Sequence, residues 1–177
     1  MSEEEIIEGC RKKHPKYQKQ LYTIYAPKML AVCKRYVNDM ELAKDVLHDA
    51  FIKVFTRIDT YKGNGSFGGW IQRVFVTTAL EQLRKDKIFL SNISIDNQQE
   101  LADGSYTSAI SEMTAEELMT CISKLPTGYR TVFNLYAIEG YSHAEIAELL
   151  NIKESTSQSQ LVKARKMLKA NIKTYLE

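Results

Sequence analysis

Residues 140–168 read GYSHAEIAELLNIKESTSQSQLVKARKML, and this stretch contains the signals of two short helices separated by a tight turn. Ser142 and Glu145 have the spacing of a capping box, which starts a helix. Asn151 readily takes the left-handed conformation that ends one. The pattern predicts a helix-turn-helix, in which the second helix enters the major groove of DNA.

The second helix of this stretch begins with small and amide side chains. Ser155 and Gln158 have the spacing of another capping box, and the inward side chains are Leu161, Ala164 and Leu168. The side chains expected on the exposed face are Thr156, Gln158, Ser159, Gln160 and Lys163. Ser and Gln hydrogen-bond base edges, and Gln pairs well with adenine. A helical hairpin without a DNA role has the same pattern and stays as the alternative.

Two helices precede this motif. The first is expected over residues 116–125 and stops at Pro126, which can also open the next helix. The second runs to about Glu139 and ends at Gly140.

A further amphipathic helix is expected over residues 41–55. Its apolar stripe is Ala43, Val46, Leu47, Ala50, Phe51 and Val54. Another face carries Asp45, His48 and Asp49, with Lys53 one turn further on. A solvated face, a metal site and a docking surface for a large partner are three readings of this cluster. The metal reading is disfavoured, because helical-bundle metal sites need more carboxylates and a second such motif.

The segment TYKGNGSFGGW, residues 60–70, is expected to be a glycine-rich loop. Tyr61, Phe67 and Trp70, with Lys62 between them, suit unstacked bases and their phosphates. Alternatively, Phe67 and Trp70 anchor the loop to the core, and for Trp70 this is the preferred reading.

The next helix is expected from Trp70 to about Lys87. Its buried stripe is Ile71, Val74, Phe75, Thr78, Ala79 and Leu83. The opposite side carries Arg73, Thr77, Glu81 and Arg84. Cations at a helix end complement the helix dipole, but the group of Arg84, Lys85 and Lys87 is more typical of phosphate contacts.

The net charge of +2 is unevenly distributed along the chain. Residues 10–90 carry a net charge of +9, which suits a polyanionic partner, whereas residues 91–113 carry −4 and are rich in Ser, Asn, Gln and Asp. We therefore expect an all-α protein of two small helical domains, residues 10–90 and 114–177, joined by a flexible acidic linker, residues 91–113.

The composition, 44% hydrophobic and 26% charged, is that of an ordinary soluble protein. No apolar run is long enough to insert into a membrane, and the acidic N-terminus lacks the pattern of a signal peptide. The three cysteines, Cys10, Cys33 and Cys121, are far apart and are expected to be reduced thiols in the cytoplasm. No phosphate-binding loop, metal-ligand set or nucleophile–base arrangement indicates an enzyme or a cofactor.

Residues from about 17 to 90 and from 114 to 172 resemble the sigma-70 family, specifically its compact extracytoplasmic-function (ECF) group. AKDVLHDAFIKVF, residues 43–55, resembles that group's polymerase-binding helix. WIQRVFVTTALEQLR, residues 70–84, resembles its promoter-melting helix. LPTGYRTVFNLY, residues 125–136, and GYSHAEIAELL, residues 140–150, resemble its C-terminal DNA-binding domain. These motifs occur in the order that the family has.

The resemblance implies a sigma factor that binds core RNA polymerase and promoter DNA, with an anti-sigma factor as a further partner. The residues implied for core binding are Asp45, His48, Asp49 and Lys53. The residues implied for the melted −10 element are Tyr61, Lys62, Ser66, Phe67, Arg73 and Thr77, with Arg84, Lys85 and Lys87 on the DNA backbone. The residues implied for the −35 element are Ser155, Thr156, Gln158, Ser159, Gln160, Lys163 and Lys166.

The chain departs from the family pattern at several of these positions. Where the family often has Asn, this chain has Thr77. Where the family usually has Lys and Arg, this chain has Gln158 and Gln160. Where the family usually has an apolar residue, this chain has Ser157. The alternative function is a helix-turn-helix regulator that does not bind polymerase, which leaves the matches over residues 43–55 and 70–84 unexplained.

Overall fold

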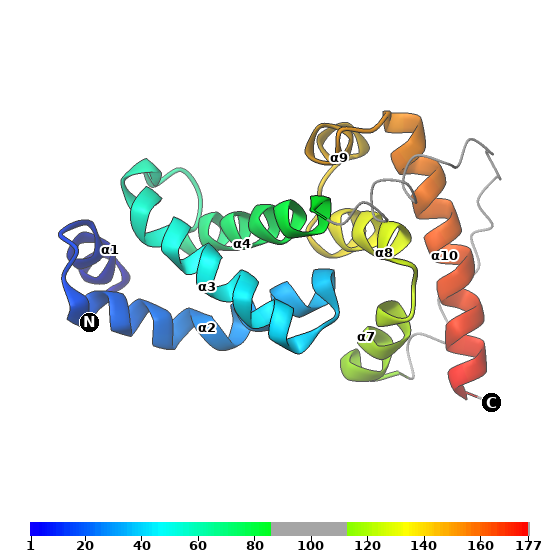
Figure 1. Cartoon of the computed structure of the whole chain (residues 1–177), viewed down its shortest axis with the longest axis horizontal. Helices are drawn as coiled ribbons and strands as arrows, with labels where there is room; N and C mark the ends of the chain where they lie inside the picture. Colours follow the sequence, from blue (N-terminus) through cyan, green and yellow to red (C-terminus); the bar gives the residue numbers. More distant parts are fainter. Residues whose placement is uncertain (86–112, 177) are drawn as a thin grey trace. The chain divides into compact units, whose positions relative to one another are not determined.

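The computed structural model describes residues 1–85 and 113–176, and every regular element in these two ranges is helical. The all-α class is therefore confirmed. The chain divides into two units, Met1–Leu83 and Arg84–Glu177 (Figure 1). Of the expected linker, only Met113 falls within the described residues. No helix in the described ranges is long and apolar enough to cross a membrane.

The helices of the first unit are α1 (Glu3–Arg11), α2 (Pro15–Val37), α3 (Met40–Arg57), the short 3-10 helix η1 (Ile58–Thr60) and α4 (Phe67–Arg84). α2 and α3 form a helical hairpin. Asn38 ends α2 in the left-handed conformation, with φ 54°. The carboxylate of Asp39 then caps α3 by accepting the N–H of Leu42 at 2.8 Å.

Helix α3 confirms the helix expected over residues 41–55. Its buried residues are the expected stripe, Ala43, Val46, Leu47, Ala50, Phe51 and Val54. Phe51 packs edge-on against Phe75 of α4, with ring centroids 5.1 Å apart, and contacts Tyr22 of α2 at 4.6 Å. Since burying one such aromatic side chain contributes roughly 1.5–3 kcal/mol, this contact holds the three helices in one core.

Helix α4 begins three residues earlier than expected. The hydroxyl of Ser66 accepts the N–H of Gly69 at 3.1 Å and therefore caps the helix. Two of the four glycines are thus helical. Only Gly63 and Gly65, with φ of 79° and 84°, use the backbone freedom of glycine in the loop. The buried face of α4 is also wider than expected, because it includes Val76 and Leu80.

The helices of the second unit are α7 (Ala115–Ser123), α8 (Thr127–Phe133), the π-helix η2 (Asn134–Ile138), α9 (His143–Leu150) and α10 (Glu154–Leu176). α7 matches the helix expected over residues 116–125. α8 and η2 together match the helix expected to end before Gly140.

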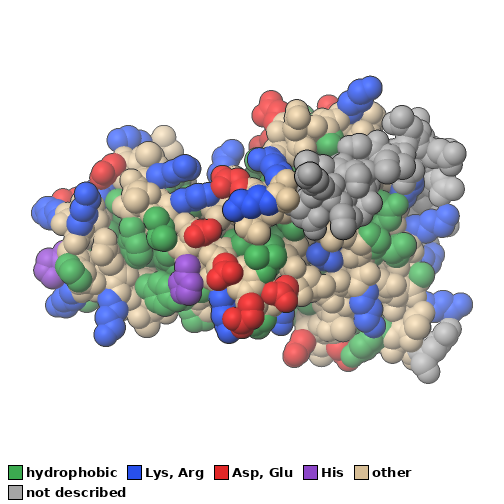
Figure 2. Space-filling view, viewed as in Figure 1, with side chains coloured by type: hydrophobic (Ala, Val, Ile, Leu, Met, Phe, Trp, Pro, Cys, Tyr) green, Lys and Arg blue, Asp and Glu red, His purple; other side chains and the backbone are tan. Residues whose placement is uncertain are grey.

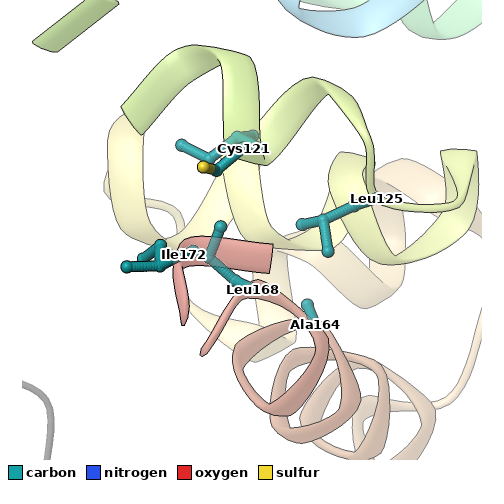
Figure 3. Close-up of a cluster of buried hydrophobic side chains, with 6 residues drawn as sticks. Cys121, Leu125, Ala164, Leu168 and Ile172 are labelled. Carbon is teal, nitrogen blue, oxygen red and sulfur yellow. The ribbon is translucent and has the colours of Figure 1, made fainter. Parts of the chain in front are cut away.

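The core of the second unit lies where α7 and α10 meet. Figure 3 shows side chains from the end of α7 facing side chains of α10; the buried cluster is Cys121, Ile122, Leu125, Ala164, Leu168 and Ile172. Arg130 joins α8 to the end of α7, because its guanidinium donates to the carbonyls of Leu125 at 2.9 Å and Ser123 at 3.3 Å. These bonds satisfy carbonyls that the end of α7 leaves without a helical partner.

The cysteines are free thiols in the interior: Cys10, Cys33 and Cys121 are all buried. Burial raises the pKa of Cys10 to about 11 and the pKa of Cys33 to about 12. Both therefore carry their proton at neutral pH and act as small apolar side chains.

The helix-turn-helix forms, but its second helix starts differently from the prediction. The capping box of Ser142 and Glu145 is confirmed, as is the left-handed Asn151, with φ 53°. The capping box predicted at Ser155 is wrong, because α10 already begins at Glu154. Ser157, which the sequence did not place on the exposed face, is wholly buried.

Candidate nucleic-acid and protein interfaces

The exposed face of α3 carries the predicted cluster of charged side chains. Asp45, His48 and Asp49 are exposed and form no ion pair or hydrogen bond with any described residue. Ile52, which the sequence analysis did not single out, stands two turns after Asp45 and is 62% exposed. In Figure 2, acidic side chains gather over the part of the first unit where Figure 1 draws α3. The face therefore combines negative charge with an exposed aliphatic side chain.

Lys53 lies at the edge of this face and has a partner within the unit. Its ammonium pairs with the carboxylate of Glu81, which ties α3 to α4. Among the described residues, no group of three or more His, Cys, Asp or Glu side chains is placed to hold a metal ion.

The glycine-rich loop between η1 and α4 is closed by Tyr61. Its hydroxyl donates to the carbonyl of Gly65 at 2.9 Å, and its ring lies 5.9 Å from that of Trp70. Lys62 is exposed and has no ion-pair partner in the described part of the chain. Half-exposed aromatic rings beside an exposed cation suit a single-stranded nucleic acid.

Phe67 does not belong to this exposed group, and its predicted contact with DNA is wrong. It is 1% exposed, and its ring stacks on Trp70 at 5.7 Å with an interplanar angle of 12°. The rings of Tyr61 and Tyr25 also pack against it, with centroids 5.1 and 6.0 Å away, so that three aromatic rings contact Phe67 inside the unit. Phe67 is thus the anchor of the loop, which was the alternative reading.

The surface of α4 presents polar side chains along one side. Arg73 is exposed, whereas Thr77 is half-buried and donates its hydroxyl to the backbone carbonyl of Arg73 at 2.9 Å. Arg84 and Lys85 are exposed at the end of the helix. Lys87 lies outside the described residues.

Helix α10 exposes fewer of the predicted residues than expected. Ser155, Gln158 and Lys166 are exposed, and Thr156 and Lys163 are half-buried. The predicted exposure of two others is wrong, since Gln160 is wholly buried and Ser159 is 7% exposed. Gln160 stands three residues after the buried Ser157, on the same side of the helix, and the hydroxyl of Ser159 turns back to the carbonyl of Thr156 at 3.0 Å.

A polar network that the sequence analysis missed links η2, α9 and α10. The Nδ1 atom of His143 lies 2.9 Å from the hydroxyl oxygen of Ser157. The His143 ring stacks on Tyr136 at 4.5 Å, and the Arg165 guanidinium lies 5.7 Å from the Tyr136 ring centroid. Partial burial lowers the pKa of His143; the Arg165 charge lowers it further, and Glu154 opposes both. No spacing rule joins residues this far apart, so the network could not be predicted from the sequence.

The class of protein follows from these surfaces. The second unit is a helix-turn-helix, a DNA-binding motif. The first unit belongs to a strongly basic part of the chain, yet it carries an exposed acidic face on α3. A transcription factor that contacts both DNA and a large protein partner has these features.

The chain belongs to the sigma-70 family, in its ECF group. The family model for sigma-70 region 2 matches residues 21–88, and the model for sigma-70 region 4 matches residues 115–168, so that together they cover more than half of the chain. It is therefore an RNA polymerase sigma factor, and members of this family are transcription-initiation factors and not enzymes.

Relatives and solved structures agree with this family. The chain is 28% identical to the ECF RNA polymerase sigma factor SigW of Bacillus subtilis, over 85% of this chain and 86% of that protein. It is 26% identical to the ECF RNA polymerase sigma-E factor of Escherichia coli K12, over 95% and 93%. Its fold resembles the sigma factor RpoE of Bartonella quintana, solved in complex with the anti-sigma factor NepR, with TM-score 0.54, 17% identity, and coverage of 88% of this chain and 96% of that one. It also resembles CnrH, solved with the cytosolic domain of CnrY, with TM-score 0.51, 18% identity and 96% coverage of each chain.

Proposed function

We propose that the face of α3 formed by Asp45, His48, Asp49 and Ile52, with Lys53 at its edge, binds core RNA polymerase. The observation that carries this assignment is that the two carboxylates and the histidine are exposed and have no partner among the described residues. An exposed aliphatic side chain among such charges is typical of a docking surface, since a partner can bury it and pair the charges around it.

The loop and α4 of the first unit bind the melted −10 element. Tyr61 offers a ring for stacking, and Lys62 supplies a charge for phosphate. Ser66 keeps an O–H that can donate to a base, since its oxygen serves only as an acceptor in capping α4. Other polar contacts on this surface come from Arg73, Thr77, Arg84, Lys85 and Lys87.

The second unit reads the −35 element as duplex through the first turns of α10. Ser155, Thr156 and Gln158 hydrogen-bond base edges, while Lys163 and Lys166 contact phosphates. The functional domains are residues 10–90 and 114–177, joined by an acidic linker over residues 91–113. Polymerase supplies the chemistry, and this chain directs it to a promoter and helps to separate the strands.

An anti-sigma factor is the further partner, and the chain acts in the cytoplasm with polymerase. Support for the partner comes from the solved structure of RpoE, because it is a complex of a sigma factor with the anti-sigma factor NepR.

Run-off transcription tests this function. Core polymerase from the same organism is mixed with fragments of its genome, with and without the protein. We expect discrete transcripts only when the protein is present, and mapping their start sites gives the promoters. A folded protein that neither binds this core nor yields transcripts would be a DNA-binding regulator instead.

A further inference from the structure

Helix α1 lies before the part of the chain that the region 2 model matches, which starts at residue 21, yet it is built into the first unit. Ile6, Ile7 and Cys10 are buried. Gly9 permits close contact with α2, because a Cβ atom at this position would lie 2.2 Å from Cγ of Tyr17. α1 is therefore fixed on α2 by close packing.

Arg11, the last residue of α1, reaches the glycine-rich loop. Its Nη2 donates to the carbonyl of Tyr61 at 2.8 Å, and its Nε lies 3.9 Å from Oδ1 of Asp59. Its Nη1 lies 3.7 Å from Oε2 of Glu8 on α1 itself. Because the Tyr61 hydroxyl bonds to Gly65, Arg11 holds the backbone of the residue that closes the loop.

A second contact joins α1 to the other end of the loop. The hydroxyl of Tyr25 donates to Oε2 of Glu3 at 3.3 Å. The ring of Tyr25 packs edge-on against Phe67, the anchor of the loop, with an interplanar angle of 90°. Burial and the charge of Glu3 raise the pKa of Tyr25, so the phenol keeps its donor proton at neutral pH.

We propose that α1 is a brace for the loop of residues 61–66, with Arg11 as its principal positioning residue. The inference rests on the proposed role of this loop in binding unpaired promoter bases. Gly63 and Gly65 give the loop many conformations when it is unrestrained, and ordering them on binding reduces affinity. The bond from Arg11 to Tyr61 restricts the loop in advance, so that less ordering is left for the binding step.

Two substitutions at Arg11 separate the effect of its hydrogen bond to the loop from the effects of its apolar packing and of its charge. Arg11→Met keeps the apolar stem but has no donor for the Tyr61 carbonyl. Arg11→Lys keeps the charge but replaces the guanidinium fork by a single ammonium. Lys12→Met is the matched control, because Lys12 is 73% exposed and its ion pair is with Glu8 of α1 itself.

Trp70 provides the measurement. It is the sole tryptophan of the chain, and its ring lies 5.9 Å from that of Tyr61, so its fluorescence reports on the loop. The full-length protein is titrated with the single-stranded non-template −10 segment of a promoter mapped by run-off transcription. The titration is repeated at several salt concentrations, and circular dichroism and core binding are measured for each variant.

We expect Arg11→Met to weaken binding of the single strand about tenfold and Arg11→Lys about threefold, with core binding and helix content unchanged. Lys12→Met should bind like the unmodified protein. The salt dependence should stay the same in Arg11→Met, whereas loss of a direct phosphate contact would lower its slope by about one.

The proposal that α1 braces the loop would be overturned if all the variants bound the single strand with equal affinity. It would also be overturned if the salt dependence of binding had a lower slope in Arg11→Met. If the unmodified protein does not bind the single strand at all, the proposed role of the loop fails first. Should Arg11→Met lose its helical fold, Asp59→Asn replaces it, since Asp59 is an exposed acid that helps to orient the guanidinium. The expected loss is then about twofold, and no loss contradicts the inference.

Discussion

Replacing Asp45 and Asp49 together by Arg reverses the charge at the centre of the α3 face. Both carboxylates are exposed and have no partner among the described residues, so each change should alter the unfolding free energy by no more than about 0.5 kcal/mol. Any loss of polymerase binding then comes from the interface and not from the fold.

The size of the loss can be estimated from the charges. An interfacial carboxylate loses about 1 kcal/mol of attraction on removal, and an Arg in its place adds about 1 kcal/mol of repulsion. Two reversals therefore cost about 4 kcal/mol, which weakens binding by almost three orders of magnitude.

Ile52→Ala tests the apolar part of the same face. Full burial of an Ile side chain is worth roughly 1.5–3 kcal/mol, and the 62% exposure of Ile52 leaves much of this for a partner to gain. The substitution should weaken binding about five- to thirtyfold. Ala is also the better helix former, so the helix itself should not be destabilised.

The assay measures the affinity of fluorescently labelled full-length protein for cognate core polymerase, with thermal unfolding followed in parallel. Glu4→Arg serves as the control, because Glu4 is an exposed acid on α1, away from this face. Binding by the Asp45/Asp49 double variant within about threefold of the unmodified protein would refute the assignment of the docking face. Because Glu4→Arg changes the net charge by two units and the double variant by four, a free-energy loss in Glu4→Arg about half that of the double variant would attribute the effect to net charge alone.

Three further predictions concern other parts of the molecule. Burial lowers the pKa of His143 in the folded state, so that the unfolded chain binds more protons as the pH drops below the ordinary histidine pKa of 6.5. The unfolding free energy of the second unit should therefore fall as the pH drops through this range. In thermal melts, His143→Gln should reduce that fall, whereas the control His48→Gln, in the first unit, should not. Phe67→Ala should destabilise the first unit by about 3–5 kcal/mol in urea titrations, whereas Trp70→Phe, which keeps a stacking ring, should cost less than about 2 kcal/mol. Gln158→Ala should reduce discrimination at one position of the −35 element by about 1–3 kcal/mol in competition binding, and an unchanged base preference would remove Gln158 from the reading surface.

The fold was largely predictable because its determinants are local. The stripe on α3 repeats with the period of a helix, and the turn before α10 is fixed by Ser142, Glu145 and Asn151, which lie close together in the sequence. The early start of α4 was missed for a related reason. The glycines that follow Ser66 suggested a loop, but a capping serine makes a helix begin before them.

The sites were less predictable because exposure depends on packing between distant segments. Phe67 is buried by rings from α2 and from both sides of its own loop, and its position among glycines gave no sign of this. Polar contacts between distant segments could not be predicted either. Neither the ion pair of Lys53 with Glu81 nor the hydrogen bond of Arg11 to the Tyr61 carbonyl follows any short spacing.

Ser157 shows how a departure from a family pattern can be accommodated inside a motif. The resemblance to the family implies an apolar residue at this position, and a buried hydroxyl without a partner costs about 1–3 kcal/mol. His143 removes that cost by lying within hydrogen-bonding distance from the first turn of α9, while Tyr136 stacks on its ring. The same bond crosses the turn of the helix-turn-helix and joins its two helices. The angle between α9 and α10 therefore depends on a polar contact, and Ser157→Val together with His143→Ala should replace this contact by an apolar one.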